Sequence, residues 1–175
     1  VHGSRGLGDV YKRQVIETIE YFTEYQFIVA GAPNIELSYY TSILKNKKIK
    51  VIENKTYELL SVSYAAIVTS GTATLETALF KVPQVVCYKS SYFSFIIAKL
   101  IVSIKYISLV NLIMDQEIVK ELIQQDCTKD KITIELKKVL NLDHRKSLKV
   151  KYDELISILG DYGTSKRVAV DIIKK

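Results

Sequence analysis

The sequence has no tryptophan, two prolines and seven glycines, and its aromatic residues are mainly twelve tyrosines. So little proline and glycine argues against a disordered chain or a loop-rich fold, since both residues are enriched there. Hydrophobic residues make up 48% and charged residues 25%, as in ordinary globular proteins. A chain of 175 residues is therefore expected to form one α/β domain with a proper buried core.

Cysteine and histidine are also scarce, with two residues of each. Cys87 lies inside an apolar run and Cys127 near an expected helix end, so neither has the spacing of a metal knuckle or of a disulfide framework. His2 and His144 are far apart and have no acidic neighbours in a ligand pattern. We therefore expect no metal, no cofactor and a reducing cytoplasmic setting.

The first residues do not have the basic, apolar and small-residue pattern of a signal peptide. Residues 1–14 contain three glycines and scattered charges without an apolar period. We interpret them as a truncated or foreign leader ahead of a domain over residues 15–175.

The formal net charge of +6 predicts attraction to anions, which leaves nucleotide phosphates, anionic lipid and nucleic acid open. The lysines between residues 45 and 50 have no interleaved aromatic residues, which a platform for single-stranded nucleic acid requires. We interpret this run as a solvated loop and expect no nucleic-acid partner.

The most informative stretch is residues 65–88. It predicts a buried strand at 65–68, a small-residue turn, a helix to about residue 80, and a second buried strand at 84–88 that follows Pro83. Two apolar strands joined by one helix form a right-handed parallel βαβ unit. The fold class predicted from this unit is an α/β, Rossmann-like parallel sheet flanked by helices.

The turn of this unit places Ser70, Gly71 and Thr72 at a helix start. Backbone N–H groups without internal partners and the helix dipole favour a phosphate there, and glycine allows close approach. Glu76 lies one turn further on the same face, where a carboxylate suits the hydroxyl pair of a ribose. The alternative is a capped helix of an ordinary α/β domain.

Asn111 is a lone amide among apolar residues, after a predicted strand at residues 105–109. Ligands of open parallel sheets bind beyond the carboxyl ends of the strands, so Asn111 either binds a ligand or satisfies a turn. Residues 90–102 predict a very apolar helix that is too short to span a bilayer; it is either a core helix or a helix that leans on a membrane surface.

The remaining pattern predicts further elements on both sides of the central unit. Strands are expected at residues 25–30 and 48–53, and helices at 15–25, 34–45, 57–64, 117–125, 130–140 and 143–159, with a last helix after residue 163.

Taken together, these stretches resemble lipid-A-disaccharide synthase, an inverting glycosyltransferase with two Rossmann-like halves (GT-B type). The similarity extends from about residue 15 to the end, and the matching motifs occur in the same order along the chain as in the family. Its motifs are residues 29–33 (VAGAP), 68–76 (VTSGTATLE), 83–89 (PQVVCYK), 106–113 (YISLVNLI), 119–124 (VKELIQ) and 159–165 (LGDYGTS).

The resemblance implies an activity. The family transfers 2,3-diacylglucosamine from UDP to 2,3-diacylglucosamine 1-phosphate (lipid X), which yields the lipid A disaccharide and UDP at the cytoplasmic face of the inner membrane of Gram-negative bacteria. Its carboxyl-terminal half binds the donor. The resemblance thus assigns the diphosphate to Ser70, Gly71 and Thr72, the ribose to Glu76, and the donor's phosphate or sugar to Asn111. Tyr88 and Lys89 are expected to line the same edge.

Two departures from the family follow from the same comparison. The amino-terminal half, which supplies acceptor binding and the acid and base groups, has no counterpart here, so we expect a donor-binding half that is inactive alone. Near the start, family members carry the sequence Leu-Pro-Gly-Ser-Arg, of which residues 1–5 (VHGSR) keep only the last three. Separately, the last helix commonly crosses to the other half in such enzymes, and exposure of its apolar face (Val168, Ile172 and Ile173) would favour a homo-oligomer.

Two other functions remain open from the sequence. One is a stand-alone nucleotide-sugar-binding module without transferase activity. The other is an epimerase of the same architecture, although that class should carry a histidine at the sheet edge and none is found there.

Overall fold

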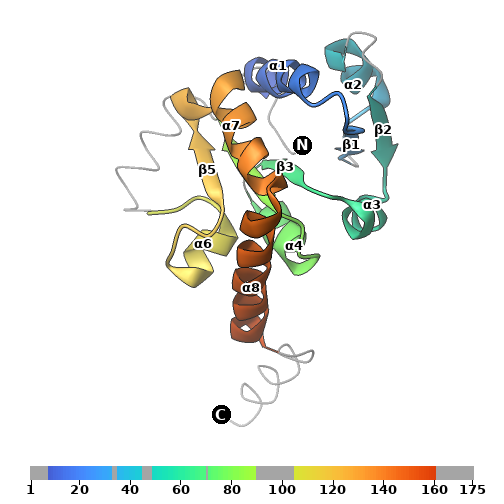
Figure 1. The fold of residues 1–175 in the computed structure, drawn as a ribbon. Helices are drawn as coiled ribbons and strands as arrows, with labels where there is room; N and C mark the ends of the chain where they lie inside the picture. The colour runs from blue at the N-terminus through green and yellow to red at the C-terminus, as the bar shows by residue number, and fades with distance from the viewer. Residues whose placement is uncertain (1–7, 33–34, 45–48, 70, 90–104, 161–175) are drawn as a thin grey trace.

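A computed structural model describes residues 8–32, 35–44, 49–69, 71–89 and 105–160 (Figure 1). The predictions for residues 1–7, Ser70, residues 90–104 and residues 161–175 therefore lie outside the described residues. These include the apolar helix at 90–102 and the last helix.

The described strands form two parallel sheets. The first pairs β1 (Ile28–Gly31) with β2 (Lys50–Glu53), and the second has the order β3-β4-β5, with bounds Ala66–Thr69, Gln84–Tyr88 and Lys120–Ile123. In the second sheet, Val68 is level with Val86, and Val86 with Glu121. All these pairings are parallel, which confirms the predicted α/β, Rossmann-like class.

Helices connect and cover the strands (Figure 1). The α-helices are α1 (Gly8–Thr18), α2 (Leu37–Leu44), α3 (Thr56–Val62), α4 (Thr72–Leu79), α6 (Leu109–Met114), α7 (Lys129–Leu140) and α8 (Leu142–Leu159), with short 3-10 turns at Ile19–Tyr21 and Gln124–Asp126. Within the described segments, none of the helices combines the length and apolar character needed to cross a bilayer.

The three-stranded sheet has a hydrophobic cluster on each face, because side chains alternate along a strand. Val85 and Cys87 of β4 pack in a cluster with Leu136 and Val139 of α7. The intervening Val86 packs in a second cluster with residues of α4, α6 and α8, including Ala78, Val110, Leu148, Tyr152 and Leu155. Strand β4 is thus buried on both faces, which explains its continuous apolar sequence.

Two predictions for the stretch between β4 and α7 are wrong. Residues 105–109 do not form a strand: Ser108 caps the start of α6, and its hydroxyl accepts a hydrogen bond from the backbone N–H of Asn111. Residues 117–125 are not a helix, because Lys120–Ile123 forms strand β5 and pairs in parallel with β4. Backbone pairing with β4 overrides the helix-forming preference of lysine, glutamate and leucine.

Apart from α1, the other described elements agree with the predictions to within a few residues, and β4 has the predicted bounds. Helix α1 lies closer to the amino terminus than the helix predicted at residues 15–25: it ends at Thr18 and is followed by the 3-10 turn Ile19–Tyr21. Helix α1 begins at Gly8 instead of Val15, so part of the expected leader is helical. In addition, the backbone N–H of Lys129 donates to Gln14 Oε1 at 2.9 Å, which ties α1 to the start of α7.

Candidate functional site

The turn between β3 and α4 is an open, glycine-dependent turn. Gly71 has φ 118° and ψ −158°, a backbone conformation that residues other than glycine rarely adopt. Among the described residues, nothing lies within 4 Å of the position that a Cβ would occupy there. The backbone at Gly71 is therefore accessible to a ligand.

Helix α4 begins after Gly71, a residue without a side chain that could cap the first N–H groups of the helix. Gly71 is its N-cap and makes no side-chain cap hydrogen bond, and the Thr72 side chain is exposed. The N–H groups in the first turn of a helix have no carbonyl four residues earlier. Thr74 N donates to Gly71 O at 3.2 Å, which leaves the N–H groups of Thr72 and Ala73 at the open end of the helix. This arrangement, together with the helix dipole, suits an anion.

Glu76 follows one turn beyond Thr72 and is half-buried. Within the described chain, its carboxylate has no hydrogen-bond or ion-pair partner. A carboxylate in this position retains its capacity to accept hydrogen bonds from a ligand.

Tyr88 is the last residue of strand β4 and Lys89 follows it; both are half-buried. Lys89 lies near Cys127: the pKa of Cys127 is lowered mainly by a hydrogen bond with Cys87, and in part by the positive charge of Lys89. The same hydrogen bond, together with burial, raises the pKa of the Cys87 thiol. Cys127 follows the 3-10 turn after β5.

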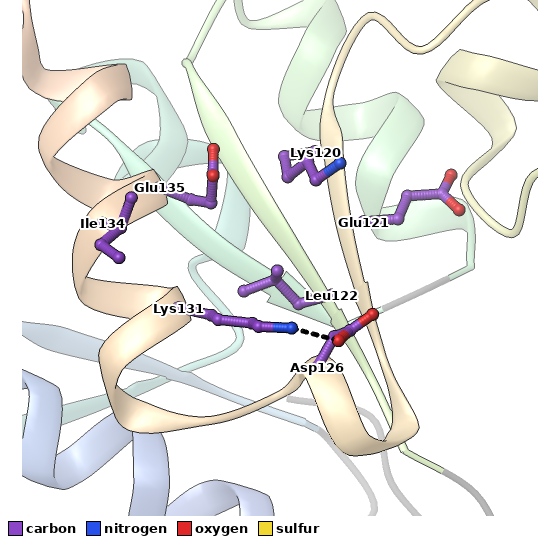
Figure 2. A pocket seen from close by; sticks show the side chains of 7 residues that line it. All are labelled: Lys120, Glu121, Leu122, Asp126, Lys131, Ile134 and Glu135. Carbon is purple, nitrogen blue, oxygen red and sulfur yellow. Dashed lines mark hydrogen bonds and ion pairs between the residues drawn. The ribbon is translucent and has the colours of Figure 1, made fainter.

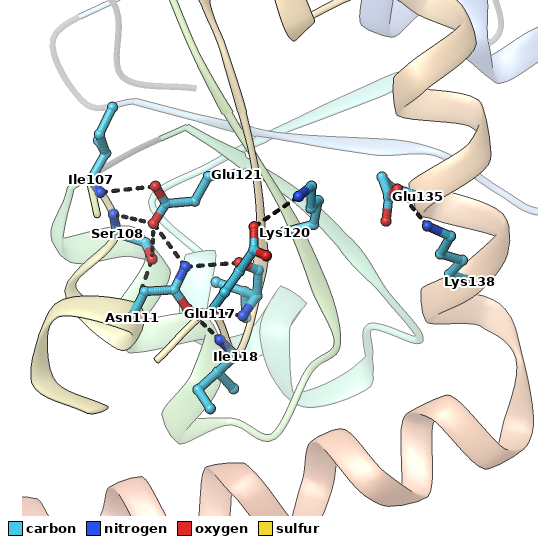
Figure 3. Close-up of polar contacts among 10 residues, drawn as sticks. Ile107, Ser108, Asn111, Glu117, Ile118, Lys120, Glu121, Glu135 and Lys138 are labelled. Atoms are coloured by element: carbon cyan, nitrogen blue, oxygen red, sulfur yellow. Dashed lines mark hydrogen bonds and ion pairs between the residues drawn. The ribbon is translucent and has the colours of Figure 1, made fainter. Parts of the chain in front are cut away.

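Asn111 is fully buried, and its amide makes four hydrogen bonds within the chain (Figure 3). Nδ2 donates to Val119 O and to Glu121 Oε1, both at 2.8 Å. Oδ1 accepts from Ile118 N at 2.7 Å and from Val119 N at 2.9 Å. The contacts match the structural alternative: the amide holds α6 against the start of β5, and its hydrogen-bonding capacity is filled.

Glu121 was not among the site residues predicted from the sequence. Its carboxylate is half-buried and accepts four hydrogen bonds from the segment around the start of α6 (Figure 3). Oε2 accepts from Ile107 N at 2.9 Å. Oε1 accepts from Ser108 N at 2.9 Å, Ser108 Oγ at 2.7 Å and Asn111 Nδ2. Local sequence carries no signal for this role, because Glu121 is placed toward the start of α6 only once the segment pairs with β4 as a strand.

Gln84, Thr74 and Tyr152 form a buried polar cluster at the first turn of α4. Gln84 Nε2 donates to Thr74 O at 2.8 Å and to the Tyr152 hydroxyl at 3.3 Å, and all three residues are fully buried. Burial raises the pKa of Tyr152, and the hydrogen bond from Gln84 opposes that shift. These contacts fix the first turn of α4 to β4 and α8.

A shallow hollow of about 280 Å³ lies between β5 and α7 (Figure 2). Several of its charges are already paired: Lys131 with Asp126, Lys120 with Glu117 and Glu135 with Lys138. None of the residues predicted for the donor site lines it. Its lining residues are Lys120, Glu121, Leu122, Asp126, Lys131, Ile134 and Glu135. In the part of the chain that the structure describes, no three His, Cys, Asp or Glu side chains are grouped as metal ligands.

Comparison with known proteins shows the family of the chain. The family model described as lipid-A-disaccharide synthetase matches residues 12–169. The chain belongs to the lipid-A-disaccharide synthetase family. The match covers the β3–α4 turn, the segment around α6 and strand β5.

Curated members of the lipid-A-disaccharide synthetase family align with most of this chain. The lipid-A-disaccharide synthase of Anaeromyxobacter dehalogenans is 32% identical over 152 residues, which covers 85% of this chain and 40% of the relative. That of Psychromonas ingrahamii is 31% identical over 95% of this chain and 45% of its own length. That of Syntrophus aciditrophicus is 37% identical over 73% of this chain and 34% of its own. The chain therefore spans between about a third and a half of the length of these relatives.

Proposed function

We propose that this chain is the donor-binding part of a lipid-A-disaccharide synthase. The reaction would transfer 2,3-diacylglucosamine from UDP to 2,3-diacylglucosamine 1-phosphate (lipid X) and release UDP in lipid A biosynthesis. Membership of the family and the names of the matched relatives support this activity.

The observation that carries the donor assignment is the open start of α4, one helical turn before Glu76, whose carboxylate has no hydrogen-bond or ion-pair partner among the described residues. In this proposal the diphosphate lies against the N–H groups of Ser70, Gly71 and Thr72 and the hydroxyls of Ser70 and Thr72. Glu76 accepts hydrogen bonds from the ribose hydroxyls, while Tyr88 and Lys89 line the same edge. Asn111 supports the site without touching the donor, because its amide is filled by contacts within the chain.

The same groups would assist the chemistry. When the sugar–phosphate bond breaks, negative charge develops on the departing diphosphate. Preorganised N–H groups at a helix start stabilise such charge without reorganising during the reaction. The open end of α4 would therefore stabilise the leaving group directly.

The remaining partners follow from the proposed activity. Lipid X would bind to the region of the full-length enzyme that corresponds to the part of the relatives not spanned by this chain. Because both substrates are lipids, the enzyme would work at the cytoplasmic surface of the inner membrane. Self-association through the expected last helix belongs to the same proposal.

Two measurements test the function. Isothermal titration calorimetry with UDP tests the donor site on the chain as it is. For transfer, the chain is co-expressed with the preceding part of the Psychromonas ingrahamii relative, and UDP release is measured with both acylated sugars present. Release that depends on both sugars is expected. UDP binding without any release, in a complex shown to assemble, would favour the stand-alone binding module.

A further inference from the structure

The Glu121 carboxylate and Thr74 mark the two ends of a short hydrogen-bonded path. At one end, Glu121 accepts hydrogen bonds from Ile107 N, Ser108 N and Ser108 Oγ at 2.7–2.9 Å, and from the amide of Asn111 at 2.8 Å. Every group that faces this carboxylate in these contacts is a donor. A charged acceptor is therefore the natural partner for this segment.

The path continues from the same segment to α4. Leu109 N, the next N–H along the chain, donates to Thr74 Oγ1 at 3.3 Å. Thr74 Oγ1 in turn donates to Gly71 O at 2.8 Å. Glu121 on β5 is thus connected, through the segment of residues 107–111 and Thr74, to the carbonyl of Gly71 at the open turn.

We propose that Glu121 is a positioning residue for the donor site, which it does not touch. It holds the segment of residues 107–111 so that Leu109 N meets Thr74, and Thr74 then holds Gly71 in the conformation that presents the start of α4 to the diphosphate. This role rests on the proposed donor site.

The negative charge and the length of Glu121 both matter for this role. A glutamine of the same shape would replace one acceptor oxygen by an NH₂ group, which would face Ile107 N or the donors around Ser108. At least one buried hydrogen bond would be lost, and a donor would face a donor. The Glu121→Gln substitution therefore displaces the segment while it preserves side-chain volume.

The test is the Kd for UDP, measured by calorimetry on the 175-residue wild type, the Glu121→Gln variant and a control. The control is Glu117→Gln, a nearby carboxylate that is 50% exposed and pairs with Lys120 on the surface. We expect Glu121→Gln to raise the Kd on the order of tenfold, equivalent to about 1.4 kcal/mol. The control should stay within about twofold, equivalent to about 0.4 kcal/mol.

Urea unfolding of each variant separates positioning from stability, because the Kd is measured where each variant is fully folded. A purely structural glutamate would lower the urea midpoint and leave the Kd of the folded protein unchanged, and that result would overturn the proposal. If Glu121→Gln does not fold, Thr74→Val and Thr74→Ser carry the test. Valine removes the hydroxyl and should weaken UDP binding, while serine keeps it and should restore binding; equal Kd values for the two would overturn the proposal.

The outcomes also separate this role from the proposed function. A wild-type chain that does not bind UDP would reject the donor site and, with it, the positioning role. A wild type that binds UDP with the same Kd as Glu121→Gln would reject the positioning role alone.

Discussion

Two polar regions lie on either side of Thr74, and they differ in how their hydrogen-bonding capacity is used. At the start of α4, Gly71 leaves open space and the Glu76 carboxylate has no partner within the described chain. Around Asn111 and Glu121, each side-chain amide or carboxylate group accepts or donates within the protein. In the proposed function the first region binds the ligand, whereas the contacts of the second hold α6 against β5.

The difference shows that a polar residue in an apolar stretch can serve opposite purposes. Buried polar groups are nearly always paired, so a filled amide such as Asn111 is a structural element. Polar groups that remain unfilled at an accessible turn are candidates for binding. Substitutions in the two regions should therefore differ in effect: those around Asn111 should lower stability, and those at the start of α4 should weaken UDP binding.

The largest loss of stability is expected for Asn111→Ala. It leaves the N–H groups of Ile118 and Val119 and the carbonyl of Val119 without their partner in a buried position. We expect the free energy of unfolding in urea to fall by about 3–4 kcal/mol. Asn141→Ala is the matched control, since Asn141 is exposed and caps α8; it should cost about 1 kcal/mol. Equal losses for the two asparagines would contradict the division.

A smaller effect is expected for Gly71→Ala. The added methyl group meets nothing within 4 Å in the described chain, so the cost comes from the backbone conformation at φ 118°. We expect the free energy of unfolding to fall by about 1–3 kcal/mol. UDP affinity should fall as well, because the turn would relax away from the conformation that exposes the helix start. A variant with unchanged stability and unchanged affinity would show that the glycine conformation is dispensable.

Tyr152→Phe tests the buried polar cluster at the first turn of α4. Loss of the hydrogen bond from Gln84 should cost about 0.5–1.5 kcal/mol at pH 7. The pKa of Tyr152 is raised in the folded state above its ordinary value of 10.0. As pH rises above 10.0, the tyrosine therefore ionises first in the unfolded chain, and the stability that Tyr152 contributes to the folded protein, which is complete at lower pH, is lost. The stability difference between wild type and Tyr152→Phe should therefore shrink between pH 9 and about pH 11, as measured by urea unfolding. A difference that grows with pH would be the wrong sign.

The smallest effect on stability is expected for Glu76→Ala, within about 0.5 kcal/mol, because its carboxylate has no partner in the described chain. UDP binding should weaken by about 1–3 kcal/mol through lost charge-assisted hydrogen bonds. Glu58→Ala, which removes an exposed carboxylate from α3, is the control and should leave UDP affinity unchanged. Unchanged affinity for Glu76→Ala would count against the ribose role.

Much of the fold could be read from the sequence where the local pattern and the tertiary environment agree. Strand β4 is apolar because both faces are buried, and α4 begins at a glycine. The stretch from Lys105 to Gln125 was misassigned for the opposite reason. Its helix-forming residues Lys120, Glu121 and Leu122 become a strand because β4 offers a backbone to pair with, and that pairing is not visible in local sequence.

The candidate site divides in the same way. Gly71 and Glu76 could be named as candidate site residues because the geometry behind that prediction, a helix start and one helical turn, is local. The role of Asn111 could not, because its partners Ile118, Val119 and Glu121 come close only when α6 folds back against β5. Glu121 was overlooked because its importance depends on the same folding back.

The central claim is that a nucleotide diphosphate binds at the open start of α4. The most direct test is a titration of the isotopically labelled chain with UDP, followed through the backbone amide resonances by NMR. Saturable shifts of Gly71, Thr72 and Ala73, with smaller shifts at Asn111, are the predicted result. Shifts confined to the hollow between β5 and α7, or no shift at Gly71 and Thr72 at saturating UDP, would contradict it.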